Sequence, residues 1–441
     1  MGWSSVSVAS DMTRRMRLAA YVQGVGASQA VWRSPRTDAS KALTLGHWAE
    51  IASTAEAGRF DVVFVADALT IGEQIATDST ERPDPIALLG ALAAVTDSIG
   101  LIGTVSTTFS DPFTVARQFA TLDHLSGGRV GWNIVTTAIQ AAANNFGSAN
   151  LPVHADRYER AEEFVEIVTR LWDAWDADAI VADRATGRYV DLERVHPINH
   201  VGEHFSVEGP LPVRRSPQGR ITLSQAGSSG PGMALGAKWA DLAFTTQFDQ
   251  ADSRDFAQRM HAQAAEFGRA EDAISVLPGI MPIIGSTEAE ARAHADELAG
   301  FVDVGALGAF LSHHFGGLDL SDLDPDGPFP DVRDDLPANA SVSRPRLYIE
   351  TALREGLSVR RLAQRIAMSL GHRPVIGTPE QVADDLAGWF GNGAADGFVV
   401  LAADLPEGLR DFTEHVVPLL QDRGLVQRDY APGTLRERIG A

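Results

Sequence analysis

Residues 225–232 read Gln-Ala-Gly-Ser-Ser-Gly-Pro-Gly, which are residue types that can bind a phosphate group. They overlap the end of a predicted strand at residues 221–226 and lead into a helical pattern at residues 231–239. A strand, a loop of small residues and a helix N-terminus offer free amides, a favourable dipole and hydroxyl donors. The stretch lacks the lysine of a Walker loop and the full dinucleotide fingerprint, so a tight strand-to-helix turn explains it equally well.

Polar side chains also occur at the ends of three other predicted strands. Residues 61–67 form a buried run that ends on Asp67, and residues 99–108 form a strand that ends in hydroxyls. Residues 130–135 form a third strand, which contains Asn133. An acid at a strand end is more often a helix cap, and an asparagine there could form a turn as well as bind a ligand. The local sequence leaves both roles open.

Three histidines at intervals of four residues could bind a metal ion if they lay on one helix. These are His196, His200 and His204, but Pro197 and Gly202 disfavour a helix in this segment. We therefore predict a loop whose histidines are solvated or packed, and no metal site.

Eight predicted strands alternate with helical segments along the chain, and they would position these polar groups. This alternation favours an α/β protein whose parallel strands close into a (β/α)8 TIM barrel, with a doubly wound open sheet as the alternative. A barrel with insertions accommodates the whole chain, residues 1–441, as one domain. The strands are predicted at residues 17–22, 61–67, 99–108, 130–135, 221–226, 241–246, 274–284 and 397–402.

A long insertion, at about residues 287–378, separates the seventh and eighth predicted strands. It contains a helix, the pair His313 and His314, an acidic Gly/Pro tract at residues 318–335, and a helical region at residues 347–369. The tract has too few apolar residues to pack by itself, so we expect a mobile loop. On a barrel the insertion would lie over the strand C-termini as a lid. The two imidazoles could act there as an acid or base, or serve the structure.

The composition narrows the class of protein. With 37 Lys and Arg against 58 Asp and Glu, the net charge is −21, which argues against a nucleic-acid or anionic-membrane surface. The absence of cysteine excludes disulfides, thiolate nucleophiles and cysteine-bound metals. No apolar run is long enough for a signal peptide or a membrane span, so we predict a cytoplasmic protein.

Several runs carry a family resemblance, and the most specific is Gly-Trp-Asn-Ile-Val-Thr at residues 131–136. Together they resemble the nitrilotriacetate monooxygenase family, a branch of the bacterial luciferase-like flavin monooxygenases. That family includes long-chain alkane, dibenzothiophene sulfone and pristinamycin-type oxygenases. The resemblance covers the whole chain, through runs at residues 60–67, 122–137, 154–158, 225–229, 377–380 and 396–398.

The resemblance implies a two-component monooxygenase. Its barrel would bind reduced FMN, delivered by a separate flavin reductase that alone uses NAD(P)H, and would use O2 as co-substrate. The resulting C4a-hydroperoxide would oxygenate a small organic substrate, and the protein would form a homo-oligomer, either a dimer or a tetramer. Such a peroxide needs a dry pocket, whose walls we expect to include Trp32, Phe109 and Phe248.

By matching motifs, the resemblance also assigns flavin contacts. It implies Asn133 near the isoalloxazine, His154 and Tyr158 near the ribityl phosphate, and Ser229, ahead of Ser228, on the phosphate itself. The full set of predicted contacts is Asp67, Thr104, Asn133, His154, Tyr158, Ser228 and Ser229.

The catalytic candidates come from the insertion. We expect His313 or His314 to assist proton transfer to or from the peroxide or the substrate, because both would lie in the lid. Two other functions stay open for the same barrel. One is hydride transfer with the deazaflavin F420, and the other is a flavin-binding barrel without catalysis.

Overall fold

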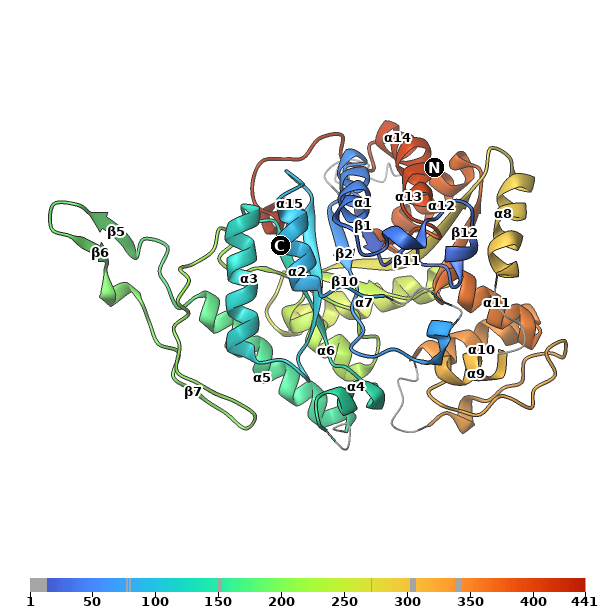
Figure 1. Cartoon of the computed structure of the whole chain (residues 1–441), viewed down its shortest axis with the longest axis horizontal. Helices are drawn as coiled ribbons and strands as arrows, with labels where there is room; N and C mark the ends of the chain where they lie inside the picture. Colours follow the sequence, from blue (N-terminus) through green and yellow to red (C-terminus); the bar gives the residue numbers. More distant parts are fainter. Residues whose placement is uncertain are drawn as a thin grey trace, which may run out of the picture.

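The computed structural model describes residues 14–76, 78, 81–148, 153–270, 272–301, 307–337 and 343–440. Its centre is a closed barrel of parallel strands surrounded by helices (Figure 1). Strand β1 pairs with β13, and β11 pairs with both β10 and β13, which closes the ring. In order around the barrel the strands are β1 (Arg17–Val22), β2 (Val62–Val65), β3 (Gly100–Ser106), β4 (Val130–Val135), β9 (Thr222–Gln225), β10 (Leu242–Thr245), β11 (Ser275–Ile284) and β13 (Gly397–Leu401). The predicted eight-stranded α/β barrel is confirmed.

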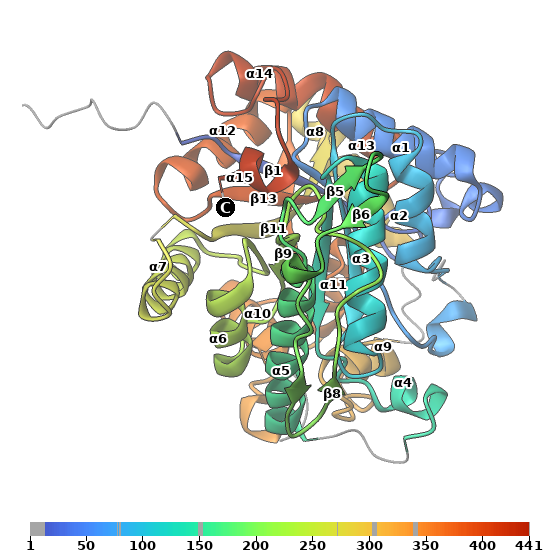
Figure 2. The same ribbon diagram turned by 90° about the vertical axis from the view of Figure 1, so that its left-hand side faces the viewer.

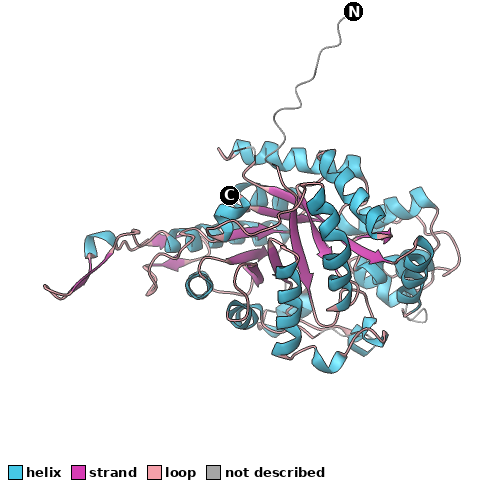
Figure 3. Cartoon of the chain, turned by 90° about the horizontal axis from the view of Figure 1, so that it is seen from above, coloured by secondary structure: helices cyan, strands magenta, loops and turns pink. Residues whose placement is uncertain are grey.

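Two of the surrounding helices, α3 (Pro112–Ser126) and α12 (Pro379–Gly391), begin at capping residues that the sequence indicates. Asp111 accepts a hydrogen bond from the backbone N–H of Thr114 ahead of α3, and Thr378 and Gln381 form a reciprocal capping box at the start of α12. Figure 3 shows the helices lying outside the strands. They are α1 (Leu45–Ala57), α2 (Pro85–Ala93), α3 (Pro112–Ser126), α4 (Gln140–Asn145), α5 (His154–Trp172), α6 (Gly230–Trp239), α7 (Gln250–Glu266), α8 (Glu288–Gly300), α12 (Pro379–Gly391), α13 (Glu407–Asp411), α14 (Val417–Asp422) and α15 (Leu435–Ile439).

Strand β4 presents its two neighbouring residues Trp132 and Asn133 to opposite sides of the barrel wall. The fully buried Trp132 packs outward between Phe119 of α3 and Phe164 of α5, with ring centroids 6.0 and 5.7 Å away. Its indole N–H donates to the carbonyl of Val105 at 3.1 Å. Trp132 is therefore part of the core, which leaves Asn133 facing the barrel interior.

The insertion between β11 and β13 contains more regular structure than the sequence predicts. Its helical region is two helices, because Gly356 adopts a positive φ of 64° and ends the first. A further strand, β12 (Arg373–Gly377), pairs with β11 from Ile280 onward. Its five residues include Pro374, so the sequence carries only a weak strand signal there. The helices of the insertion that follow α8 are α9 (Leu307–His314), α10 (Ser343–Glu355) and α11 (Val359–Ser369).

The acidic tract at residues 318–335 differs from the mobile loop that we expected. Leu320 and Phe329 are 5% and 3% exposed, and they pack in one apolar cluster with Phe315 and Tyr348. A few apolar side chains of the tract suffice here because α9, α10 and α11 supply most of the cluster. Backbone hydrogen bonds from Phe329 to Leu357 and from Val359 to Gly327 also fasten the tract to the insertion.

Two short hairpins lie between α5 and β9. Strands β5 (Ile180–Asp183) and β6 (Arg188–Val190) form the first, and β7 (His200–Val201) and β8 (Ser206–Val207) form the second. The first hairpin extends away from the barrel (Figure 1), and Figure 2 views the molecule from that side.

As the sequence predicts, the histidines spaced four residues apart in this segment are not on a helix. His200 lies in β7 and its Nε2 is 2.9 Å from Glu163, whereas Nε2 of His196 is 3.2 Å from Asp176. These two imidazoles therefore contact different carboxylates. In the ranges that the structure describes, no helix has both the length and the apolar character needed to cross a bilayer.

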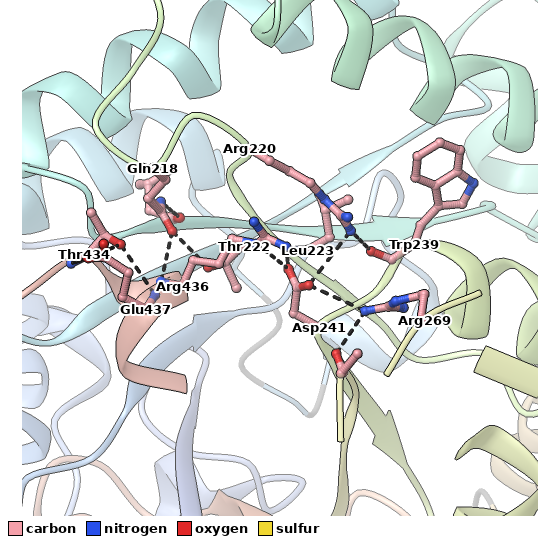
Figure 4. A network of polar contacts seen from close by, with 12 residues as sticks. Gln218, Arg220, Thr222, Leu223, Trp239, Asp241, Arg269, Thr434, Arg436 and Glu437 are labelled. Atoms are coloured by element: carbon pink, nitrogen blue, oxygen red, sulfur yellow. Dashed lines mark hydrogen bonds and ion pairs between the residues drawn. The ribbon is translucent and has the colours of Figure 1, made fainter. Parts of the chain in front are cut away.

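A buried carboxylate organises the base of the barrel, opposite the strand C-termini (Figure 4). Asp241 precedes β10, is fully buried, and accepts a hydrogen bond from the backbone N–H of Leu223 at 2.9 Å. Three arginines surround it at 3.6 to 3.9 Å: Arg220, Arg269 and Arg436. Because Arg436 belongs to α15, this network ties the end of the chain to two barrel strands.

Candidate active site

A large cavity, of about 1220 Å³, lies at the C-terminal ends of the barrel strands. This is the face of a (β/α)8 barrel on which catalytic residues are found, and the volume suits a cofactor together with a small substrate. His154 begins α5, but its side chain lies outside the described residues. The other six predicted flavin contacts all line the cavity: Asp67, Thr104, Asn133, Tyr158, Ser228 and Ser229.

Asn133 is held inside the barrel by its neighbours on both sides. Its amide N–H donates to the hydroxyl of Thr104 at 3.0 Å, and its amide oxygen accepts from the hydroxyl of Ser224 at 3.2 Å. The Thr104 hydroxyl in turn donates to the carbonyl of Val65 at 3.0 Å. These side chains meet because Thr104, Asn133 and Ser224 are register partners on β3, β4 and β9. An amide has a second N–H and a second lone pair, so this fixed group can still bind a ligand.

Helix α6 directs its N-terminus at the cavity. Ser229 is its N-cap, and the hydroxyl oxygen accepts from the backbone N–H of Gly232 at 3.3 Å. Because this bond uses the oxygen only as an acceptor, the Ser229 hydroxyl keeps its own proton to donate. Hydroxyl and amide donors at a positive helix end suit a phosphate group.

The glycines of this turn permit an unusually close approach of the chain. A Cβ on Gly232 would lie 3.0 Å from both the Tyr158 hydroxyl and the Cα of Gly227. Gly227 donates its N–H to the side chain of Gln225 at 2.7 Å, which fixes the end of β9 against the turn. Tyr158 and the α6 N-terminus therefore meet at one place, which neither sequence motif specifies by itself.

Aromatic side chains cover the cavity at the barrel interior. The ring of Phe64 packs against Phe244 at 4.7 Å and against Tyr21 at 5.6 Å, and all three line the cavity. They come from β2, β10 and β1, whose inward-facing residues meet only once the barrel closes. Sequence inspection did not single out any of them.

The aromatic walls proposed from the sequence were wrong, because none of the three residues is among those that line the cavity. Trp32 is 43% exposed. Phe109 stacks on Phe146 at a centroid distance of 4.6 Å. Phe248 packs on the apolar cluster of the insertion. Each residue is close in sequence to the end of a strand, but its side chain packs on other apolar residues or is exposed to solvent.

Asp67 lies half-buried in the cavity wall. Burial is the main cause that raises the pKa of its carboxyl, and the nearby charge of Asp84 raises it further. A hydrogen bond of 2.8 Å from the backbone N–H of Ala68 and the charge of Arg82 act in the opposite direction. A carboxyl group that keeps its proton more readily than usual can donate a hydrogen bond to a ligand as well as accept one.

The histidine pair of the insertion lies apart from the cavity lining. His313 and His314 end α9, and neither is among the residues that line the cavity. The ring of His314 packs on Phe310 at 4.5 Å. Burial lowers the pKa of His314 to about 3, with smaller contributions from the neighbouring charges of His313 and Arg344. His314 is therefore a neutral imidazole at any pH near neutrality.

The insertion does contribute other polar groups to the cavity. Arg344 of α10 donates to Nε2 of His372 at 3.3 Å, and Nδ1 of His372 lies 3.3 Å from the hydroxyl of Thr246. All three residues line the cavity. Sequence inspection missed them because no local motif links residues that are 28 and 126 positions apart.

The chain matches known proteins along almost its full length. The luciferase-like monooxygenase family matches residues 30–396. The N-acetyl-S-(2-succino)cysteine monooxygenase of Bacillus subtilis (strain 168) is 44% identical over 427 residues, which cover 97% of each chain. The nitrilotriacetate monooxygenase component A of Aminobacter aminovorans is 42% identical, over 97% of this chain and 96% of that protein.

Solved structures agree with these matches. The EDTA monooxygenase of Chelativorans sp. BNC1 superposes with a TM-score of 0.83 at 36% identity, over 97% of this chain and 98% of that one. A riboflavin lyase solved with modified FMN and riboflavin superposes with a TM-score of 0.85 at 33% identity, over 97% and 96% of the two chains. An F420-dependent alcohol dehydrogenase, at 14% identity and a TM-score of 0.57, shares the fold alone.

Proposed function

The chain belongs to the luciferase-like monooxygenase family, and from this premise we propose that it is the oxygenating component of a two-component flavin monooxygenase. In this proposal it binds reduced FMN and uses O2 to oxygenate a small organic substrate. The observation that carries it is one cavity that combines a fixed amide at Asn133 with a phosphate-type helix end at Ser229. An isoalloxazine needs hydrogen-bonding edges and an apolar surround, and a ribityl phosphate needs clustered donors.

The donor set at the α6 N-terminus fits the phosphate of FMN. Ser229 and Ser228 would donate hydroxyl protons, and the phenol of Tyr158 would add a third donor. Arg157, which is 3% exposed and lines the same cavity, would supply positive charge nearby. Asn133 and Thr104 would orient the ring system, and Asp67 would contact the cofactor from the mouth of the cavity.

Bound reduced FMN supplies the electrons that activate O2. The chain's part is to bind, orient and exclude water. The packed rings of Tyr21, Phe64 and Phe244 would keep the cavity interior dry, which protects a reactive oxygen species from hydrolysis and stray protons.

Proton transfer by His313 or His314 stays a prediction. Neither residue lines the cavity, so either would have to act through a water or through a movement of the insertion. Replacing both by Asn and measuring product formed per reduced FMN decides the question, because an unchanged yield would remove both from the mechanism.

Two partners follow from the proposal. One is a flavin reductase, since the relative from Aminobacter aminovorans is named as one component of its monooxygenase, which implies a second component. The other is the small substrate. The names of relatives do not define its class, because they range from nitrilotriacetate to dimethyl sulfide and long-chain alkanes.

The proposal is tested by mixing the protein with photoreduced FMN, O2 and a panel of small organic substrates, and identifying products by mass. Incorporation of one atom from ¹⁸O2 into a product is the expected result. No product from any substrate, with O2 consumption equal to that of free reduced FMN, would contradict the proposal.

A matched pair of variants tests the phosphate position in the same system. Ser229→Asp and Ser229→Asn both keep a good helix N-cap, but only Asp adds a negative charge. We expect Ser229→Asp to weaken FMN binding at least tenfold, because like charges a few ångströms apart repel by roughly 4 kcal/mol at an effective dielectric near 20. Ser229→Asn should stay much closer to the unmodified protein. Fluorescence titration of FMN measures both, and equal affinities would refute the assignment.

A further inference from the structure

A second polar group lines the same cavity as the expected flavin contacts but comes from other elements. Those contacts come from β2, β3, β4, α5 and the start of α6, whereas Arg344 comes from α10 and His372 precedes β12. Thr246 follows β10, and the hydroxyl of its neighbour Thr245 lies 3.4 Å from that of Ser228. Arg344, His372 and Thr246 form one hydrogen-bonded chain along the side of the cavity that the insertion supplies.

The protons in this chain can be assigned from its chemistry. A guanidinium only donates, so Nε2 of His372 must accept from Arg344. Burial, aided by the charge of Arg344, lowers the pKa of His372 well below its usual value, so the ring is neutral and its single proton is on Nδ1. Nδ1 then donates to the Thr246 oxygen, which leaves the Thr246 hydroxyl proton free to point elsewhere. The chain therefore presents a cation and a hydroxyl donor to the cavity.

The barrel is shaped to hold this imidazole. A Cβ on Gly279 of β11 would lie 2.1 Å from Nδ1 of His372, so only glycine leaves room for the ring at that point. The position of His372 then fixes one nitrogen of the Arg344 guanidinium. The other N–H groups of the guanidinium lie in one plane as a fork, and this geometry binds a carboxylate most specifically.

The charge of Arg344 is not neutralised by the residues that the structure describes. It forms no ion pair among them, whereas Arg373 and Arg365 pair with Asp385 and Glu355 at 2.7 and 2.6 Å. Other charged residues also line the cavity: the acids Asp67, Asp252, Asp255 and Glu350, and the arginines Arg157, Arg259 and Arg346. An anion would consequently find at Arg344 a cation that is both uncompensated and held in place by His372.

We infer that Arg344, positioned by His372 and assisted by Thr246, binds a carboxylate of the substrate, and that the substrate is a small organic acid. The role of this carboxylate site in turnover rests on the proposed monooxygenase function, whereas the binding of the acid does not depend on that proposal. The flavin phosphate would bind separately, at Ser229 on the α6 N-terminus.

Binding of acids and their esters tests the inference. The probes are nitrilotriacetate, tricarballylate and N-acetyl-S-carboxymethylcysteine, each paired with its methyl ester, titrated calorimetrically into the protein saturated with FMN in metal-free buffer. We expect at least one acid to bind more tightly than its ester. Arg344→Gln should weaken the binding of that acid at least tenfold. Arg344→Lys keeps the positive charge but loses the forked N–H groups, so it should weaken the binding less. Arg344 is exposed, so these variants are expected to fold.

A matched control separates a local contact from a general loss of charge. Arg354 lies on the same helix, is 50% exposed and contacts only its neighbour Glu355 among the described ion pairs, at 3.9 Å. Arg354→Gln should bind the acid as the unmodified protein does. Equal binding by Arg344→Gln, or no acid preferred over its ester, would overturn the inference.

Two further measurements keep this inference apart from the proposed function. FMN affinity should be unchanged in Arg344→Gln, and a parallel loss of FMN would reassign the cation to the flavin phosphate and so overturn the substrate site. Arg344-dependent acid binding without incorporation of ¹⁸O2 would support the acid site while contradicting the monooxygenase proposal.

Discussion

At the scale of single residues, burial rather than residue type determines what the histidines can do. His314 packs on Phe310, and burial lowers its pKa to about 3. His372 is likewise kept neutral, but it faces the cavity and accepts a hydrogen bond from Arg344. A neutral imidazole can hold a neighbour in place without adding charge. The structure thus favours a positioning role for His372, a residue that no sequence motif marked.

The buried imidazole of His314 should make the protein sensitive to acid. Its pKa is near 6.5 in the unfolded chain and about 3 in the folded protein, so below pH 6.5 protons bind preferentially to the unfolded state. Between these two pH values, this one group should lower the free energy of unfolding by about 1.4 kcal/mol for each unit by which the pH falls. We expect His314→Leu to reduce that slope by about the same amount. Urea unfolding at several pH values between 6.5 and 4.5 measures it.

A control variant is available at an exposed histidine. His196 is 53% exposed, so His196→Gln should follow the slope of the unmodified protein. Parallel curves for His314→Leu and the unmodified protein would show that His314 is not buried as a neutral ring.

At the scale of elements, the Asp241 network shows how the base of the barrel supports the site at its other end. Asp241 links β9 and β10 through Leu223, and it links both to α15 through Arg436. Strand β9 continues directly into the turn at Gln225 and Gly227 that positions the α6 N-terminus. Errors in the register of β9 would therefore displace the predicted phosphate contacts.

Removing the charge of Asp241 should destabilise the barrel strongly. Asp241→Asn keeps the shape of the side chain but leaves three arginines without their shared counter-charge. Breaking a buried charge cluster from one side typically costs about 3 kcal/mol or more. We expect a loss of that size in the free energy of unfolding, measured with urea. The control Asp331→Asn, which removes an exposed pair with Arg333, should leave stability unchanged within error.

At the scale of the whole molecule, one feature does not belong to the compact barrel. The hairpin of β5 and β6 extends away from it, beyond a base formed by Trp175 and Val195. Tyr189 and Leu192 on this arm are 64% and 80% exposed. An isolated two-stranded hairpin is marginally stable in water, and its exposed apolar side chains gain most by packing against another surface. A second copy of the chain is the partner that we expect, in a symmetric dimer.

Shortening the arm tests this expectation. Replacing residues 177–193 by a short Gly/Ser loop keeps the base, where the N–H of Asp176 donates to the carbonyl of Arg194 at 3.0 Å. Light scattering after gel filtration should show a dimer for the full chain and a monomer for the shortened one. The substitution Glu193→Gln, on the same arm, should leave the dimer intact. A full chain that is monomeric at tens of micromolar would contradict the expectation.

Local patterns in the sequence favoured the barrel and marked part of the cavity wall. Eight apolar runs and their caps predict the strands and helices because strand and helix periods depend on neighbouring residues alone. Polar residues at strand C-termini must then share one face of a parallel barrel. Asp67, Asn133, Ser228 and Ser229 accordingly line one cavity, together with Thr104 and Tyr158, which only the family resemblance named. Their roles toward FMN stay predictions.

The tertiary structure alone determined which distant residues meet. Tyr21, Phe64 and Phe244 face one another because the barrel closes, and no spacing along the chain reveals that. Arg344 reaches His372 and Thr246 because the insertion folds back over β10 and β11, where Gly279 leaves space for the ring. Such contacts depend on the packing of whole elements, whereas sequence periodicity specifies only each element's own apolar face. The chemistry that we assign to the substrate side of the cavity therefore became visible only in the folded chain.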